Sequence, residues 1–194
     1  MNDFVAVFHG LGGNTGPKVV PYTFEDVVAD LNGVVAYDWA GFLRERLDSH
    51  AVAAPLGGVT NGGYKLVYKD TMNPWSEMAA GEAGVVDFWY SLGLHVGSKG
   101  GIHDVEMNGV GYKAGFGPGM TIVAVNGRAF SIAVLRTAVQ EAKGTQTPIE
   151  FIVENTGFYR VMKVDYHDGE KFPFLERVAG TPDRMDEILK PMAK

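Results

Sequence analysis

The sequence contains no cysteine, so disulfide bonds and thiolate-bound zinc are excluded. It also has no apolar run close to the roughly 20 residues that a membrane-spanning helix needs. Lys and Arg number 17 against 23 Asp and Glu, which gives a formal net charge of -6. The basic residues are scattered singly, so we expect neither a nucleic-acid surface nor a polybasic membrane patch. The hydrophobic share of 46% is ordinary for a globular protein and allows a real core.

Several catalytic motifs are missing as well. The sequence has no His-Glu-x-x-His and no Gly-x-Ser-x-Gly, and its five histidines show no metal-ligand spacing. The glycine-rich stretch from Gly10 to Gly16 is not followed by Lys-Ser or Lys-Thr, so we interpret it as a plain loop and not as a phosphate cradle. We therefore expect no catalytic residue, no metal ligand and no cofactor in this segment.

The first third of the chain has a helical pattern. Thr23 is followed three residues later by Asp26, which indicates a capping box at a helix start. Asp38 is suited to cap another helix, and apolar residues recur near helical spacing after both caps. These helices are too few and too short to form a core of their own. Residues 1–54 therefore look like the end of a larger domain.

Residues 55–84 read as a glycine-rich linker with one strand. The segment Tyr64–Lys69 has the alternating pattern of a strand. Asn73-Pro74-Trp75 is typical of the start of a short helix, which we expect to reach about Ala83.

The region 85–167 shows short strands, turns and one clear helix. Asn126-Gly127 after Ile122–Val125 is a strong hairpin signal because such a turn needs positive φ. Ser131 is placed to cap a helix, and two further strands are joined through Asn155-Thr156-Gly157. The tail, 168–194, ends in a short predicted helix near Asp186 to Leu189.

Two motifs in this region belong together. The first is Ser91-Leu92-Gly93-Leu94-His95-Val96, and the second is Ala-Gly-x-x-Pro-Gly-x-x-Ile-x-x-Val-Asn-Gly over residues 114–127. The pair resembles a PDZ domain of the bacterial kind, although Met120 stands where that pattern usually has Asp. The resemblance implies an α+β fold: a partly open β-barrel or sandwich with one or two helices, here preceded by a small helical segment.

The residues of the first motif suggest a peptide groove. Gly93 permits a loop whose backbone N–H groups converge on a carboxylate, and we expect the strand after it to have an open edge to which an extended peptide can add. The helix after Ser131 would close the opposite wall. The predicted groove residues are Leu92, Gly93, Leu94, His95, Val96, Ile132, Leu135 and Val139. The apolar members fit an ordinary core equally well, and the ligand is left open between a C-terminus, an internal strand and the chain's own tail.

The order of segments extends the resemblance to nearly the full chain. Tyr22–Val27 and Asp38–Leu43 precede the PDZ-like part, and Phe172–Arg177 follows it. This order is similar to the C-terminal region of the glycyl aminopeptidase family of zinc metallopeptidases. The resemblance implies that residues 1–54 end a thermolysin-like catalytic domain, 55–84 form a linker, 85–167 form the PDZ domain, and 168–194 form a tail that packs back. Zinc is expected only in an upstream catalytic domain, and a bacterial, extracytoplasmic location is favoured.

The sequence thus predicts a peptide-binding PDZ region of an aminopeptidase-type metallopeptidase, which holds or orients peptides and is inactive alone. The expected partners are a protein C-terminus or extended strand and the protein's own catalytic domain. The alternative is a non-enzymatic PDZ scaffold that recruits another protein. A PDZ domain attached to a serine protease of the high-temperature-requirement type is disfavoured, because the helices of residues 1–54 do not resemble that protease's barrel.

Overall fold

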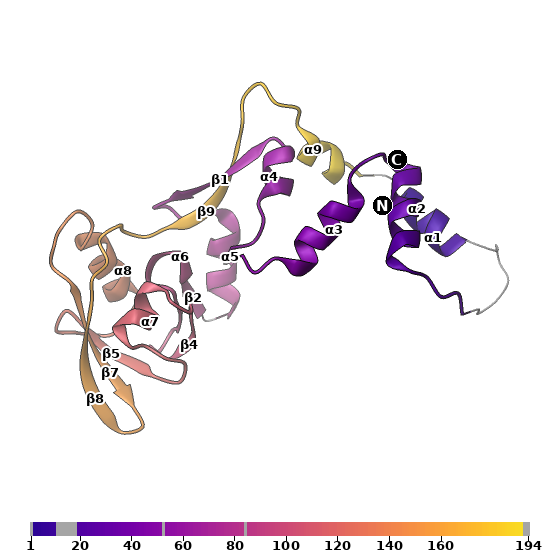
Figure 1. Cartoon of the computed structure of the whole chain (residues 1–194). Helices are drawn as coiled ribbons and strands as arrows, with labels where there is room; N and C mark the ends of the chain where they lie inside the picture. Colours follow the sequence, from indigo (N-terminus) through magenta and orange to yellow (C-terminus); the bar gives the residue numbers. More distant parts are fainter. Residues whose placement is uncertain (1, 11–18, 52, 84, 192–194) are drawn as a thin grey trace. The chain divides into compact units, whose positions relative to one another are not determined.

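The computed structural model describes residues 2–10, 19–51, 53–83 and 85–191. The chain divides into two compact units, Met1–Pro55 and Leu56–Lys194, which are described in turn (Figure 1). Most of the glycine-rich stretch 10–16 lies outside the described residues, so its interpretation as a loop stays a prediction. No helix in the described ranges is long and apolar enough to cross a membrane.

The described residues of the first unit form three helices, α1 (Asn2–Gly10), α2 (Phe24–Val34) and α3 (Trp39–Asp48). The predicted capping box of α2 is confirmed: the Asp26 N–H donates to Thr23 Oγ1 at 3.2 Å, and the Thr23 N–H donates to Asp26 Oδ2 at 2.8 Å. The predicted cap of α3 is also confirmed, since Asp38 accepts a hydrogen bond from the Gly41 N–H at 2.9 Å. None of the described residues of this unit is buried.

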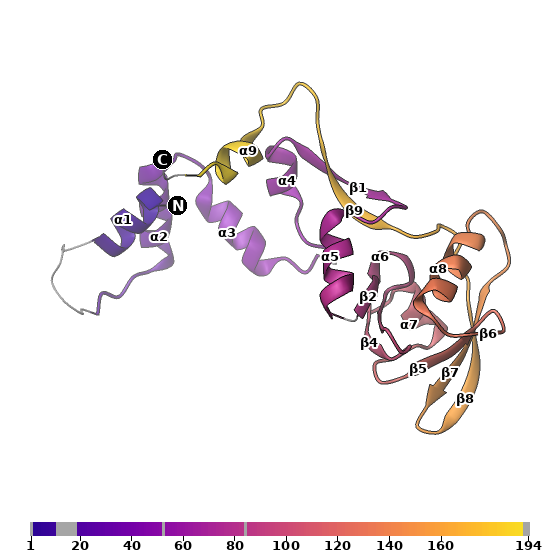
Figure 2. The ribbon, with the colours of Figure 1, turned by 180° about the vertical axis from the view of Figure 1, so that it is seen from behind.

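The second unit begins and ends with elements that include a pair of strands, β1 and β9. They are α4 (Gly57–Asn61), β1 (Tyr64–Lys69), α5 (Pro74–Ala83), β9 (Phe172–Arg177) and α9 (Arg184–Leu189). Strands β1 and β9 form an antiparallel two-stranded ribbon, visible in Figures 1 and 2. The predictions of a strand at 64–69, a helix from Pro74 to Ala83 and a short helix near the C-terminus are confirmed.

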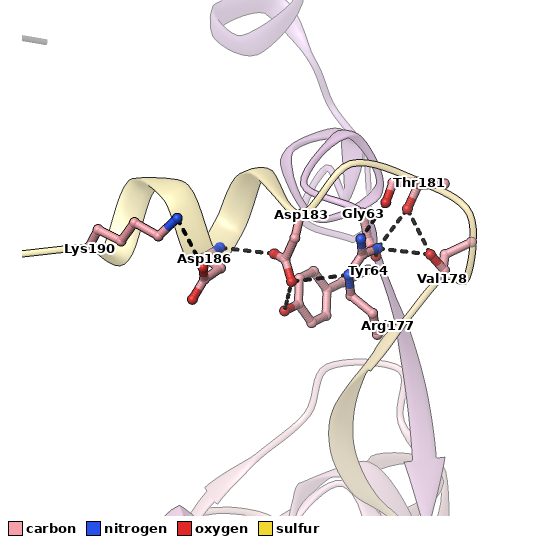
Figure 3. A network of polar contacts seen from close by, with 8 residues as sticks. All are labelled: Gly63, Tyr64, Arg177, Val178, Thr181, Asp183, Asp186 and Lys190. Carbon is pink, nitrogen blue, oxygen red and sulfur yellow. Dashed lines mark hydrogen bonds and ion pairs between the residues drawn. The ribbon is translucent and has the colours of Figure 1, made fainter.

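Arg177 fastens the end of this ribbon (Figure 3). Its guanidinium donates to the Gly63 carbonyl at 2.6 Å and pairs with Asp183 Oδ2 at 3.1 Å. The Tyr64 hydroxyl donates to the same carboxylate at 3.2 Å, and Asp183 caps α9 through the Asp186 N–H. A two-stranded ribbon is marginal in water on its own, so this network stabilises it where side-chain burial is small.

The centre of the second unit contains ten short elements. They are β2 (Val85–Phe88), α6 (Trp89–Leu92), β3 (Leu94–Gly97), β4 (Ile102–Val105), α7 (Val110–Ala114), β5 (Thr121–Val125), β6 (Arg128–Ala129), α8 (Ile132–Glu141), β7 (Ile149–Asn155) and β8 (Phe158–Val164). The strands form two open antiparallel sheets, in the orders β2-β3-β4 and β6-β5-β7-β8. Backbone hydrogen bonds from Ile102 to the Met120 carbonyl (2.7 Å) and from Ile122 to the Gly100 carbonyl (2.8 Å) join the two sheets at one corner.

One hydrophobic core lies between these sheets and α8. Its fully buried members come from both sheets and from the helix, and include Phe88, Leu94, Ile122, Leu135 and Phe151. The fold class is therefore α+β with open sheets, as predicted, and no closed barrel forms among the described residues.

The predicted local signals of this region are confirmed. Asn126 and Gly127 have φ values of 46° and 75° and connect β5 to β6, as a turn of this type requires. Ser131 accepts a hydrogen bond from the Val134 N–H at 3.1 Å and starts α8. Leu135, Ala138 and Val139 of α8 are buried in the core.

Candidate peptide-binding groove

Gly93 lies at the left-handed turn that links α6 to β3. Its φ is 68°, and a Cβ at this position would lie 3.1 Å from Cβ of Glu106. The Gly93 N–H, which the sequence suggested for carboxylate binding, donates instead to the carbonyl groups of Phe88 and Trp89, both at 3.1 Å. That donor is therefore already satisfied inside the chain.

The prediction that β3 has an open edge is wrong, because β3 is the central strand of its sheet. Strand β4 pairs with one edge and β2 pairs with the other, in the antiparallel register Val86↔Val96, Asp87↔His95 and Phe88↔Leu94. An extended segment has thus added to β3 as a PDZ ligand is expected to do, but the segment is part of the same chain. Strand β2 was hard to predict, since four residues are too few for a periodic strand signal.

The apolar residues predicted to line the groove are brought together by the fold. Leu92, Leu94, Val96, Leu135 and Val139 all have 0% exposure and belong to one cluster. Ile132 is half-buried at the start of α8. Phe88 from β2 is 1% exposed in the same cluster. Phe88 of β2 therefore shares one core with the side chains of β3 and α8 that were predicted to line the groove.

Arg136 of α8 joins the helix to this strand. The guanidinium carbon lies 5.7 Å from the ring centre of Phe88 and 5.8 Å from that of Phe172 in β9. Sequence reasoning missed this residue, although its spacing from Ile132 and Val139, four and three residues away, puts it at the rim of the apolar face of α8.

Glu170 holds Arg136 in place. Arg136 Nη1 lies 3.1 Å from Glu170 Oε1, and Gln140 Nε2 donates to Glu170 Oε2 at 3.4 Å. The Glu170 side chain is only 4% exposed, and its Oε1 has the ion-pair contact but no hydrogen bond with favourable geometry among the described residues. Burial raises the pKa of the Glu170 carboxyl above its ordinary value, and the Arg136 charge opposes this rise without cancelling it.

His95 is the one predicted groove residue with a polar side chain. Its imidazole is 37% exposed, stacks on the Trp89 ring with 4.7 Å between ring centres, and has Nε2 at 3.5 Å from Asp87 Oδ1. Asp87 Oδ1 also accepts a hydrogen bond from the Trp89 N–H at 2.7 Å. His95 therefore faces the side chain of the strand that occupies the groove.

A separate cleft of about 660 Å³ is lined by residues of α6, α7 and the segment 165–171. Aromatic rings and charges of both signs line it, and the Asp165 carboxylate, which accepts a hydrogen bond from the His167 imidazole, raises the pKa of His167. No group of three His, Cys, Asp or Glu side chains that could hold a metal ion occurs in the described part of the chain. The residues predicted to bind a peptide, which the fold gathers around β3 and α8, are the candidate functional site.

Comparisons with known proteins place the fold. No family model and no curated protein matches the chain. A crystal structure of an aminopeptidase N family protein from Idiomarina loihiensis matches 88% of this chain with a TM-score of 0.55 and 15% identity, and the match spans 29% of that protein. The PDZ domain of HtrA3 bound to a phage-derived ligand gives a TM-score of 0.30 and 18% identity, over 58% of this chain and 92% of that domain. The chain thus shares its fold with less than a third of a longer aminopeptidase N family protein.

Proposed function

We propose that this chain is the non-catalytic, strand-binding region of an aminopeptidase-type protein similar to the glycyl aminopeptidase family. Its PDZ-like unit holds an extended segment by strand addition beside β3, and β2 is the segment held in the resting state. The observation that carries the proposal is the antiparallel seating of Val85–Phe88 on β3, with Phe88 under Arg136 of α8. The fold shared with part of the aminopeptidase N family protein supports the context.

A tethered strand is a strong competitor for any external peptide. Short connections give an effective concentration on the order of millimolar, and β2 is joined to β3 only through Trp89–Gly93. A free peptide that binds as well as β2 must therefore reach roughly millimolar concentration to displace half of it. Peptide binding then depends on how firmly β2 is held.

The test weakens β2 without touching β3 or α8. In Val86→Asp a half-buried valine of β2 becomes a carboxylate, which should weaken docking of the strand by about 1–3 kcal/mol, or roughly 5- to 150-fold. The matched control is Val161→Asp, the same change on β8 at a side chain that is 60% exposed. A labelled peptide with the sequence of residues 85–90 is titrated against each chain by fluorescence anisotropy.

The expected result is that Val86→Asp binds the peptide at a concentration about fivefold or more below that needed by the unchanged chain and the control. If a folded Val86→Asp chain binds no peptide at several millimolar, strand exchange is refuted. The groove is then a permanent part of the core.

In the complete protein, zinc in an upstream catalytic domain would polarise the scissile carbonyl. The groove described here would only hold or orient the peptide, which raises its local concentration. Val86→Asp should therefore change KM for longer peptides while dipeptide-like substrates keep their kcat and KM. An equal effect on both substrate classes would contradict a holding role.

The second candidate function is a non-enzymatic docking module. The burial of Phe88, at 1% exposure, favours it because a side chain so deep in the core resists removal. In that case β2 fixes the segment before it to the PDZ-like unit, and any protein partner binds elsewhere.

A further inference from the structure

We infer that the groove selects extended segments with the pattern aliphatic–acidic–aromatic, read by the core, by His95 and by Arg136. The inference rests on the proposed function, because it takes β2 as the built-in example of a ligand. Of three consecutive residues of β2, Val86 and Phe88 face the hydrophobic core and Asp87 faces His95.

The aromatic position lies opposite Leu94. The Phe88 ring is buried against the core and has the Arg136 guanidinium 5.7 Å from its centre. A cation above a ring face is attracted by the ring quadrupole, and the attraction grows when water is excluded. The Arg136 side chain is only 21% exposed and is held by Glu170, so the cation is already in position before a ligand arrives.

The acidic position lies opposite His95. Asp87 Oδ1 is 3.5 Å from His95 Nε2 and accepts the Trp89 N–H at 2.7 Å. The residue in register on the other side, Asp104 of β4, forms no ion pair with His95 in the described part of the chain, so the imidazole faces the occupant of the groove. When β2 leaves, the His95 imidazole loses the Asp87 carboxylate as its neighbour, and an incoming carboxylate would replace it.

The aliphatic position lies opposite Val96. Val86 is half-buried and packs against the hydrophobic cluster. A β-branched side chain suits this pleated, partly buried surface. In strand addition, main-chain hydrogen bonds supply affinity and side-chain contacts supply specificity. The three positions would supply that specificity here.

The experiment measures discrimination ratios in the Val86→Asp chain, in which β2 competes least. Three peptides are compared: the sequence of residues 85–90, the same peptide with cyclohexylalanine at the Phe88 position, and the same peptide with Asn at the Asp87 position. Cyclohexylalanine keeps the size and apolar character of phenylalanine but lacks the ring quadrupole. We expect each change to weaken binding about two- to fivefold.

A second chain adds Arg136→Met and Glu170→Gln to Val86→Asp, which removes the cation and its buried partner together. Here the preference for phenylalanine over cyclohexylalanine should fall to about one, while the preference for Asp over Asn should remain. Arg160→Lys on the exposed strand β8 is the control and should change neither ratio.

The outcomes separate the two proposals. If all three peptides bind the Val86→Asp chain equally well, the inferred pattern is refuted and strand addition stands. If the phenylalanine preference survives removal of Arg136, the assignment of that residue is refuted. If no peptide binds, both the proposed function and the inferred pattern fail.

Discussion

The buried pair Arg136–Glu170 gives the most specific stability prediction. Arg136→Met keeps a long side chain but leaves the Glu170 carboxylate, 4% exposed, without its charge partner, which should cost about 3 kcal/mol. Glu170→Gln leaves Arg136, which is 21% exposed and can reach water, and should cost about 1 kcal/mol. Removing both charges together should also cost about 1 kcal/mol, because no uncompensated charge stays buried.

The assay is urea unfolding at pH 7, followed by tryptophan fluorescence, for all four chains of this double-mutant cycle. Additive effects would sum to about 4 kcal/mol, so a double variant near 1 kcal/mol gives a coupling energy of about 3 kcal/mol. A double variant as unstable as the sum of the single variants would refute the idea that the two charges compensate each other. If the dependence of the unfolding free energy on urea concentration differs between variants, the unfolded or native state has changed.

The pH dependence of the same variants checks the cause. Burial raises the folded-state pKa of Glu170 above its ordinary value of 4.5, so the folded chain holds this proton more tightly than the unfolded chain does. The contribution of this group to the free energy of unfolding is therefore complete below 4.5 and falls as the pH rises through the raised pKa. The fall should be larger in Arg136→Met, which lacks the opposing charge, and absent in Glu170→Gln. Equal pH profiles in these two variants would contradict the assignment.

Three further substitutions test the turn, the helix cap and the ribbon. Gly93 has a φ of 68°, and an added Cβ would lie 3.1 Å from the Glu106 side chain, so Gly93→Ala should lower the free energy of unfolding by about 1–2 kcal/mol or more. Gly127→Ala should cost less, because Gly127 also has positive φ but has open space around it. Equal losses of stability in urea unfolding would contradict the crowding argument. Thr23→Ala should lower the stability of α2 by about 1 kcal/mol, seen as a loss of helical circular dichroism, and an unchanged signal would rule out a stabilising cap. Arg177→Lys keeps the charge but cannot span the same acceptors, so amide hydrogen exchange in β1 and β9 should accelerate, and unchanged protection would show that the network in Figure 3 is dispensable.

Much of the local structure could be predicted because its signals lie within a few residues of each other. The Thr23–Asp26 box and the Ser131 cap satisfy N–H groups at the start of their own helices, whatever else the chain does. The positive φ of the Asn126-Gly127 turn is likewise a property of those two residues. Such features survive in any tertiary context, so a single sequence is enough to find them.

The state of the groove could not be predicted in the same way. The expectation of an open edge on β3 failed because pairing with Val85–Phe88 is a competition between possible strands, and no local rule decides it. Glu170 was missed because its burial depends on Arg136, which is 34 residues earlier in the chain. A charge on the rim of an apolar helix face was the available clue, but its partner is set by tertiary packing.

The short length of β3 limits which interactions can give the proposed groove its affinity for a strand. Strand β3 has only four residues, so main-chain hydrogen bonds are few and do not depend on sequence. Closing the connection Trp89–Gly93 is easy, and doubling its length would change the entropy of closure by only about 0.6 kcal/mol. One charged residue in place of Val86 should outweigh that change. On the proposed function, the composition of Val85–Phe88 should therefore matter more than the length of the connection for whether this groove is open or filled.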